Sequence, residues 1–202
     1  KNYWKNWKYI KSSIMSKKNI LRNKFFKKRK KKYYKVNNFF FDPLKKIINK
    51  IEKTSVYVAI YMPINYELNT LFCMNMQSSK KIYFLAPKVT SKNDMCFFEV
   101  KKNDVFQVNK YGILEPIVTK KKSRYLPDII LMPLLAYDKK NNRLGYGKGY
   151  YDHYLNNQKK KIKTIGIAFS FQETKEIPIN KHDVKMDYIL TEKGLHWYKW
   201  IF

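Results

Sequence analysis

Ile129-Ile130-Leu131-Met132 is an uninterrupted apolar run, and Gly145-Tyr146-Gly147-Lys148-Gly149 follows it at a short distance. The apolar run predicts a strand buried on both faces, as in a parallel sheet. Only six of the 202 residues are glycine, and three of the six lie in the second stretch. A helix is predicted to begin at Tyr151, so this loop would present backbone N–H groups and a positive helix end to an anion. We therefore expect a phosphate site there, with charge from Arg143 and Lys148; a flexible turn is the simpler alternative.

The loop does not match the two common nucleotide-binding motifs. A Walker loop needs glycine six residues before the lysine and Ser or Thr after it, but Asn142 and Gly149 occupy those positions. A dinucleotide fingerprint would need glycine at position 150, which is Tyr150. Any phosphate bound here is therefore held by a different arrangement.

Apolar periodicity along the rest of the chain predicts strands that alternate with helices. The expected strands are residues 56–61, 81–86, 129–132, 164–169 and 188–191, with 96–100 and 105–108 as a hairpin pair at an edge. The expected helices are residues 16–34, capped by Ser16, then 39–53, 70–78 and 151–158. This order predicts an α/β fold with a mixed, mostly parallel sheet covered on both faces.

The net charge of +28 is unevenly distributed and poor in arginine. Residues 1–50 hold 18 Lys and Arg against one acid, Asp42, yet the whole chain has only four arginines. Nucleic-acid readers use arginine heavily, so most of this charge, including residues 27–32, is interpreted as solvated surface. Binding of single-stranded RNA by the aromatic and basic first quarter remains an alternative, but no specific nucleic-acid partner is expected.

Two further features limit the class of protein. No apolar run approaches the length of a membrane helix. Cys73 and Cys96 form neither a disulfide framework nor a zinc motif, which favours a reduced, cytoplasmic protein. Residues 1–16 are interpreted as a basic extension and residues 17–202 as one domain. An upstream extension, a targeting peptide and a native arm are all compatible with the first segment.

The longer stretch around the glycine loop resembles a known family. Leu131-Met132-Pro133-Leu134-Leu135-Ala136-Tyr137-Asp138 and Asn142-Arg143-Leu144-Gly145-Tyr146-Gly147-Lys148-Gly149-Tyr150-Tyr151-Asp152 resemble the signature of 5-formyltetrahydrofolate cyclo-ligases, also called methenyltetrahydrofolate synthetases. Supporting matches in the same order are Lys18 with Arg22, Tyr61-Met62-Pro63, Glu67-Leu68-Asn69-Thr70, Ala86-Pro87-Lys88, Gly112-Ile113-Leu114-Glu115-Pro116, His182-Asp183 and Thr191-Glu192. The resemblance covers about residues 17–195.

The resemblance implies a three-layer α/β/α sandwich with N-terminal helices and a soluble, cytoplasmic enzyme that uses ATP and Mg²⁺. The implied reaction converts 5-formyltetrahydrofolate to 5,10-methenyltetrahydrofolate with release of ADP and phosphate. The formyl oxygen would attack the γ-phosphorus, and N10 would then close the ring. The implied partner is a small-molecule folate, possibly polyglutamylated, bound by a monomer without membrane attachment.

The resemblance also implies a role for each matched residue. Arg143 and Lys148 would be catalytic. The implied ATP-binding residues are Lys18, Arg22, Lys88, Arg143, Gly145, Gly147, Lys148, Gly149 and Tyr151. The implied substrate-binding residues are Met62, Glu67, Tyr146 and Tyr150, and the implied metal ligands are Asp152 and Asp183. From the residues alone, Lys18 and Arg22 could equally be surface cations, Asp152 a helix cap and Glu67 a surface side chain on a turn.

Three positions depart from the family pattern. Tyr146 stands where the family usually has arginine, Lys88 replaces an arginine, and Asn69 replaces an acid. The loss of a cation at position 146 leaves open a folate binder that no longer turns over. It also predicts that the Tyr146→Arg substitution raises kcat/KM, because the side chain at this position should cross the mouth of the site.

Overall fold

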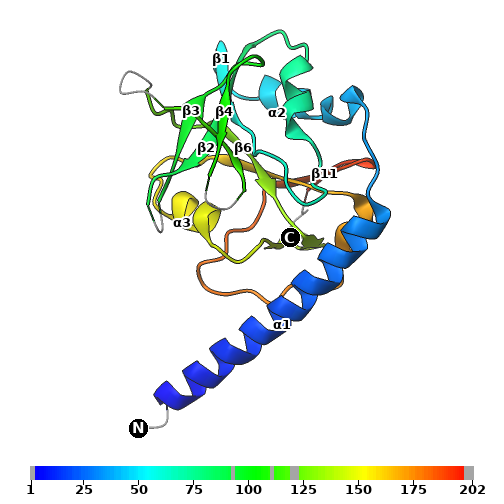
Figure 1. Ribbon diagram of the computed structural model, residues 1–202, viewed down its shortest axis with the longest axis vertical. Coiled ribbons are helices and arrows are strands. Elements are labelled where there is room, and N and C mark those ends of the chain that lie inside the picture. The colour runs from blue at the N-terminus through cyan, green and yellow to red at the C-terminus, as the bar shows by residue number, and fades with distance from the viewer. Residues whose placement is uncertain (1–2, 92–93, 110–111, 119–122, 198–202) are drawn as a thin grey trace.

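A seven-stranded, mostly parallel sheet forms the centre of the protein (Figure 1). The computed structural model describes residues 3–91, 94–109, 112–118 and 123–197. In sheet order the strands are β12 (Gly194–Trp197), β11 (Tyr188–Thr191), β9 (Lys163–Ile167), β6 (Ile129–Pro133), β1 (Ser55–Ala59), β2 (Lys81–Val89) and β3 (Met95–Glu99). The five inner strands run parallel, and only the edge strands β3 and β12 are antiparallel to their neighbours. This confirms the predicted mixed sheet.

The apolar run that predicted a buried strand becomes β6, in the middle of the sheet. Side chains alternate across a strand, so Ile129 and Leu131 face one apolar cluster while Ile130 and Met132 face the other. All four are at most 1% exposed. The first cluster is covered by α2 (Leu44–Asn49) and the 3-10 helices η1 (Asn38–Phe41) and η2 (Thr70–Asn75), and the second by α3 (Tyr150–Asn156). Helical elements therefore cover both faces of the sheet.

Several predicted boundaries are wrong for local reasons. Asp42-Pro43 divides the predicted helix of residues 39–53 into η1 and α2, because proline cannot donate the backbone bond that a continuous helix needs. The predicted hairpin of residues 96–100 and 105–108 does not form. Instead β3 pairs with β2, while β4 (Phe106–Val108) pairs with β5 (Leu114–Pro116) in a separate ribbon. The sequence did not reveal a small second sheet, which consists of β10 (Glu173–Thr174), β7 (Ala136–Asp138) and β8 (Arg143–Leu144). The 3-10 helix η3 (Ser170–Gln172) directly precedes β10.

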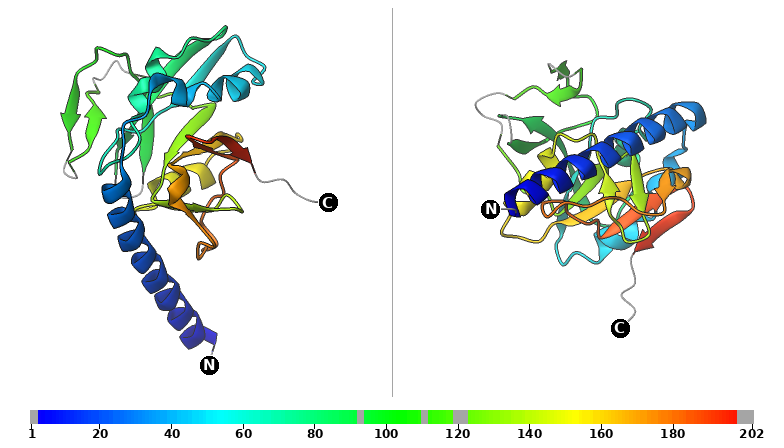
Figure 2. Two further views of the ribbon diagram at one scale, coloured as in Figure 1. Left: turned by 90° about the vertical axis from the view of Figure 1, so that its right-hand side faces the viewer. Right: turned by 90° about the horizontal axis from the view of Figure 1, so that it is seen from below.

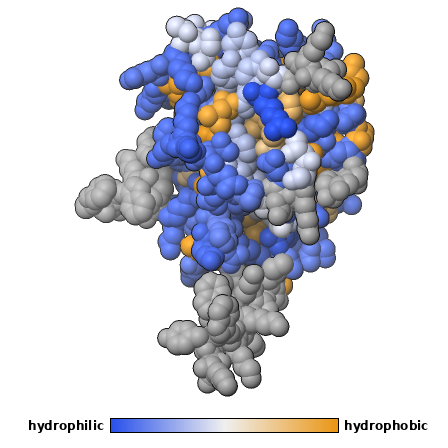
Figure 3. Space-filling view, turned by 90° about the vertical axis from the view of Figure 1, so that its left-hand side faces the viewer, coloured by the Kyte–Doolittle hydropathy of each residue, from blue (hydrophilic) through white to orange (hydrophobic). Residues whose placement is uncertain are grey.

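The longest element is α1 (Tyr3–Lys32), whose N-terminal part extends beyond the body of the molecule (Figures 1 and 2). The prediction that this helix begins at Ser16 is wrong. Residues 3–16 contain neither glycine nor proline, so nothing in the sequence stops the helix there. Within the described residues, α1 and the other helices lack the combination of length and apolarity required to cross a bilayer. The face shown in Figure 3 is largely hydrophilic, with smaller hydrophobic patches.

The buried carboxylate of Asp138 fixes the turn that delivers the glycine loop. Asp138 is 1% exposed, and its Oδ1 accepts the backbone N–H groups of Lys140 at 2.9 Å and Asn142 at 3.0 Å. Its Oδ2 accepts from the Asn142 amide at 2.9 Å and from the Ile177 N–H at 3.1 Å. One side chain therefore joins β7, the turn and the segment after β10.

The Asp138→Ala substitution should reduce the free energy of unfolding by about 2–4 kcal/mol, because buried donors lose their charged acceptor. Urea denaturation measures this change. The matched control is Asp42→Ala, since the Asp42 side chain forms an exposed ion pair with Lys45, and its loss should cost less than about 1 kcal/mol. Equal losses for the two variants would contradict the role of Asp138.

Candidate functional site

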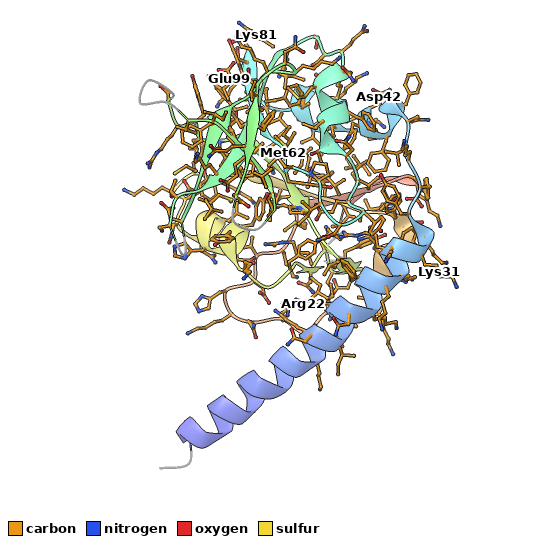
Figure 4. All side chains as sticks on the ribbon, viewed as in Figure 1. Arg22, Lys31, Asp42, Met62, Lys81 and Glu99 are labelled. Atoms are coloured by element: carbon orange, nitrogen blue, oxygen red, sulfur yellow. The ribbon has the colours of Figure 1, made fainter. Side chains whose placement is uncertain are left out.

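A cavity of about 900 Å³ opens at the carboxyl ends of β1, β2 and β6. The chain runs from β1 outward through β2 to β3, then returns through β6 to β9 and β11 on the other side. Ligands of open α/β sheets bind where the strand order reverses in this way. Tyr61 and Met62 line the cavity after β1, and Pro133 lines it at the end of β6. Figure 4 labels two contributors, Met62 in this segment and Arg22 on α1.

The glycine loop forms one wall of the cavity. Gly147 and Gly149 have φ values of +94° and +74°, which favour glycine over other residues. A Cβ atom on Gly147 would lie only 3.1 Å from Cζ of Arg22. Arg22 also donates from Nε to the Gly145 carbonyl at 2.9 Å, and burial lowers its pKa while Asp183 opposes that shift. Because α3 has only seven residues, the positive charge at this wall comes mainly from side chains.

Lys18 and Asp183 meet directly at the cavity. The Lys18 Nζ lies 2.5 Å from Oδ2 of Asp183, which also accepts the Asn180 N–H at 2.7 Å. Lys18 is only 7% exposed, and both it and Arg22 line the cavity. The alternative that Lys18 and Arg22 are ordinary surface cations is therefore wrong.

Arg143 and Asp152 form a second ion pair, with 2.7 Å between Nη2 and Oδ1. The same Oδ1 accepts the Val184 N–H at 3.0 Å, and Arg143 donates from Nη1 to the Val184 carbonyl at 2.7 Å. The residue at the N-terminal cap of α3 is Gly149, so Asp152 does not cap the helix. Its carboxylate instead orients Arg143 and holds the segment around Val184 against the loop.

The two acidic residues expected as metal ligands, Asp152 and Asp183, both lie at the cavity. Among the described residues, no group of three or more His, Cys, Asp or Glu side chains is placed to hold a metal ion. The hydrogen bonds described above fall on Oδ1 of Asp152 and on Oδ2 of Asp183. Mg²⁺ is commonly held by one or two carboxylates together with substrate phosphates and water. These residues fit such an ion only when phosphate completes its ligands.

Glu67 is buried at another wall of the cavity, not exposed on a turn. It is 5% exposed, and its Oε2 accepts the Ile64 N–H at 2.9 Å. Its Oε1 has no hydrogen-bond partner within the described part of the chain. Burial raises the pKa of Glu67 to about 7, although the Ile64 bond and the charge of Arg29 both lower it. In the turn before it, Asn65 and Tyr66 have φ values of 49° and 65°. Such left-handed backbone is strained for residues other than glycine, and this strain is typical of functional segments.

Arg29 is the residue that sequence reasoning missed. It lies in the run interpreted as solvated, yet it is 1% exposed. It donates from Nη1 to the Leu134 carbonyl at 3.0 Å and from Nη2 to the Tyr146 hydroxyl. Its spacing from Arg22 and Phe25 puts it on the same face of α1, which is a signal that the sequence did contain.

The remaining expected residues divide into two groups. Met62, Tyr150, Tyr151 and Lys148 line the cavity, as does Tyr146. The structure does not bring Lys88 to the cavity wall. Side chains alternate along β2, so Pro87 and Val89 face the cavity while the Lys88 amine donates to the Pro116 carbonyl at 3.3 Å.

Comparisons with known proteins agree with the observed fold. A model of the 5-formyltetrahydrofolate cyclo-ligase family matches residues 14–192. The chain is 31% identical to the 5-formyltetrahydrofolate cyclo-ligase of Haemophilus influenzae over 151 residues, which cover 71% of this chain and 80% of that one. The 5,10-methenyltetrahydrofolate synthetase structure from Aquifex aeolicus superposes with a TM-score of 0.68 at 28% identity, covering 90% and 93% of the two chains. The corresponding Mycoplasma pneumoniae structure gives 0.60 at 26% identity, covering 86% and 97%.

The Glu67→Gln substitution should stabilise the protein at pH 8 by about 1–3 kcal/mol, because it removes a buried charge. Between pH 4.5 and 7 the unfolded chain releases the Glu67 proton while the native state keeps it. Native stability therefore falls as pH rises through that window, and the advantage of glutamine should disappear near pH 5. Calorimetric melting at both pH values measures this. A difference that is the same at pH 5 and pH 8 would contradict the raised pKa.

The contact of Tyr146 with Arg29 argues against the expectation that an arginine at position 146 would raise activity. The Tyr146 ring lies 5.7 Å from the guanidinium carbon of buried Arg29, and its hydroxyl accepts from that group. Tyr146→Arg would bring two cations together in a buried place. We expect kcat/KM to fall by about tenfold or more. A repulsion between the two cations with the free energy of a single pKa unit is already enough for a tenfold change. A rise in kcat/KM at unchanged melting temperature would restore the original expectation.

Proposed function

The chain belongs to the 5-formyltetrahydrofolate cyclo-ligase family, and from this premise we propose that it forms 5,10-methenyltetrahydrofolate from 5-formyltetrahydrofolate at the expense of ATP. The observation that supports this most strongly is that one cavity carries two kinds of binding group. Cations suited to a polyphosphate and a buried carboxylate suited to a pterin line the same space. ATP and folate can therefore meet there.

Phosphoryl transfer needs positive charge and oriented donors around the γ-phosphate. Lys18, Arg22, Arg143 and Lys148 supply this charge, and the glycine loop supplies backbone N–H groups close to it. Arg143 is held in place by Asp152 and Val184, so little reorganisation is needed when phosphate binds. Lys148 lies on the exposed part of the loop, where it can reach the transferred group.

The folate would occupy the apolar part of the cavity. Met62, Tyr146 and Tyr150 offer surface for the ring system, and Glu67 offers an acceptor for adjacent pterin N–H groups. The Oε1 atom of Glu67 has no partner within the described residues. Because a buried polar atom without a partner is costly, a donor from the ligand would satisfy it.

The proposed chemistry balances without a covalent enzyme intermediate. The formyl oxygen attacks the γ-phosphorus while the bond to the β-phosphate oxygen breaks, so ADP leaves. The N10 lone pair then attacks the formyl carbon and N10 loses its proton. The carbon–oxygen bond breaks, and phosphate leaves with the former formyl oxygen. Binding of both substrates in one cavity contributes through proximity.

We further propose that Asp152 and Asp183 hold Mg²⁺ together with the ATP phosphates, and that the ion neutralises phosphate charge when bound. Lys18 contacts Asp183 in this structure. Because ATP also attracts Lys18, this contact would be exchanged when nucleotide binds. Polyglutamylation of the substrate, a monomeric state and a cytoplasmic location remain predictions.

Incubation of the protein with Mg-ATP and 5-formyltetrahydrofolate tests the function directly. The absorbance of methenyltetrahydrofolate should grow, one ADP should form per turnover, and omission of ATP should abolish both. Folate binding measured by calorimetry without any turnover would identify a folate binder that has lost catalysis.

Lys148→Ala should lower kcat/KM by a factor equivalent to about 2–4 kcal/mol, the usual cost of losing a charged contact to the transition state. The melting temperature should hardly change because Lys148 is exposed. The matched control is Lys139→Ala, which removes an exposed lysine outside the cavity lining and should retain full activity. Full activity of Lys148→Ala at saturating ATP would exclude this lysine from the phosphate site.

A further inference from the structure

Arg29 is a buried cation placed directly behind the cavity wall. It is not among the residues that line the cavity, whereas Tyr146, to which it donates, does line it. Arg29 also donates to a neutral carbonyl, that of Leu134. Among the described residues Arg29 forms no salt bridge, and its Nε has no hydrogen-bond partner. A charge in this position is costly unless a nearby negative charge compensates it.

Glu67 lines the same cavity as Tyr146, and its negative charge offsets that of Arg29 only in part, because its pKa of about 7 leaves the carboxyl partly protonated at neutral pH. The charge of Arg29 and the hydroxyl of Tyr146 both act on the Glu67 carboxyl, and both favour its ionised form. Two other titratable groups face it, Tyr61 from the segment after β1 and Tyr151 from α3. Burial raises the pKa of each tyrosine above its ordinary value, so both stay neutral near pH 7. Among the described groups that act on Glu67, Arg29 is therefore the cation.

We propose that Arg29 is a positioning residue for folate binding: acting through Tyr146, it keeps Glu67 ionised for the pterin. This inference rests on the proposed function, because it assumes that Glu67 accepts the pterin N–H groups. Arg29 touches neither substrate nor reacting atoms. It acts by placing positive charge and an oriented hydroxyl behind a carboxylate that burial alone would protonate.

The arrangement explains why α1 carries an arginine and not a lysine at this depth. The planar guanidinium donates in two directions at once, to Leu134 and to Tyr146. The first bond fixes α1 to the end of β6, and the second fixes the glycine loop to α1. Electrostatic support of Glu67 is thus coupled to the position of the loop.

The dissociation constant of 5-formyltetrahydrofolate, measured by titration calorimetry without ATP from pH 6 to pH 8.5, tests this proposal. Wild-type affinity should weaken below about pH 7, where Glu67 takes up a proton. Arg29→Met should move this midpoint upward by about one pH unit. Its dissociation constant should then be about fivefold larger than that of the wild type at pH 7 and within about 1.5-fold of it at pH 8.5.

Two conservative variants separate charge from packing. Arg29→Lys keeps the positive charge and should restore most of the midpoint. Tyr146→Phe keeps the ring but removes the hydroxyl, so its midpoint should move in the same direction as that of Arg29→Met, by less. Tyr146→Phe carries the test alone should Arg29→Met fail to fold, as judged by its melting curve.

A uniform loss of affinity at every pH in Arg29→Met or Tyr146→Phe would overturn the proposal, because a merely structural role predicts that result. Equal behaviour of Arg29→Lys and Arg29→Met would also overturn it. Glu67→Gln distinguishes a different failure. Wild-type affinity in that variant would remove Glu67 from the folate site, and with it the assignment on which the proposal rests, whereas weak and pH-independent binding supports both.

Discussion

The basic face of α1 binds two parts of the cavity wall and the residue that follows β6, and the shape of the site depends on those contacts. Lys18 pairs with Asp183, Arg22 donates to the Gly145 carbonyl, and Arg29 donates to the Leu134 carbonyl. Spacings of four and seven residues put the three side chains on one helical face. Each contact involves a charged donor, and such hydrogen bonds are stronger than neutral ones. One helix therefore sets the distance between the glycine loop, the end of β6 and the segment around Asp183.

Two buried carboxylates show how similar groups serve different purposes. Asp138 accepts four hydrogen bonds and fixes the turn between β7 and β8. Glu67 accepts one backbone bond and keeps an oxygen without a partner in the described chain, and burial raises its pKa to about 7. A satisfied carboxylate stabilises the fold. An unsatisfied one at a cavity wall costs stability and leaves an acceptor for a ligand, which is the arrangement expected of a binding residue.

The parts of the fold that local pattern determines were predictable. β6 and β11 appear where continuous apolar runs lie, and the concentration of glycine marked the loop that lines the cavity. The pairing of β3 with β2 was not predictable, since strand partners depend on contacts that are distant in the sequence. The burial of Arg29 was missed because it lies within a run of lysines and only tertiary packing covers it, whereas the sequence left open whether Glu67 lies in the site or on a surface turn. Lys88 was expected in the loop after the strand, but β2 continues to Val89. Strand alternation therefore turns the Lys88 side chain away from the cavity.

Transfer of the formyl oxygen to phosphate is the step that the cavity is proposed to serve, and isotope labelling measures it most directly. The protein would be incubated with Mg-ATP and 5-formyltetrahydrofolate that carries ¹⁸O in its formyl group. Mass spectrometry of the released phosphate should show one ¹⁸O atom for each methenyltetrahydrofolate formed. Unlabelled phosphate, with the label recovered in water, would contradict attack of the formyl oxygen on the γ-phosphorus.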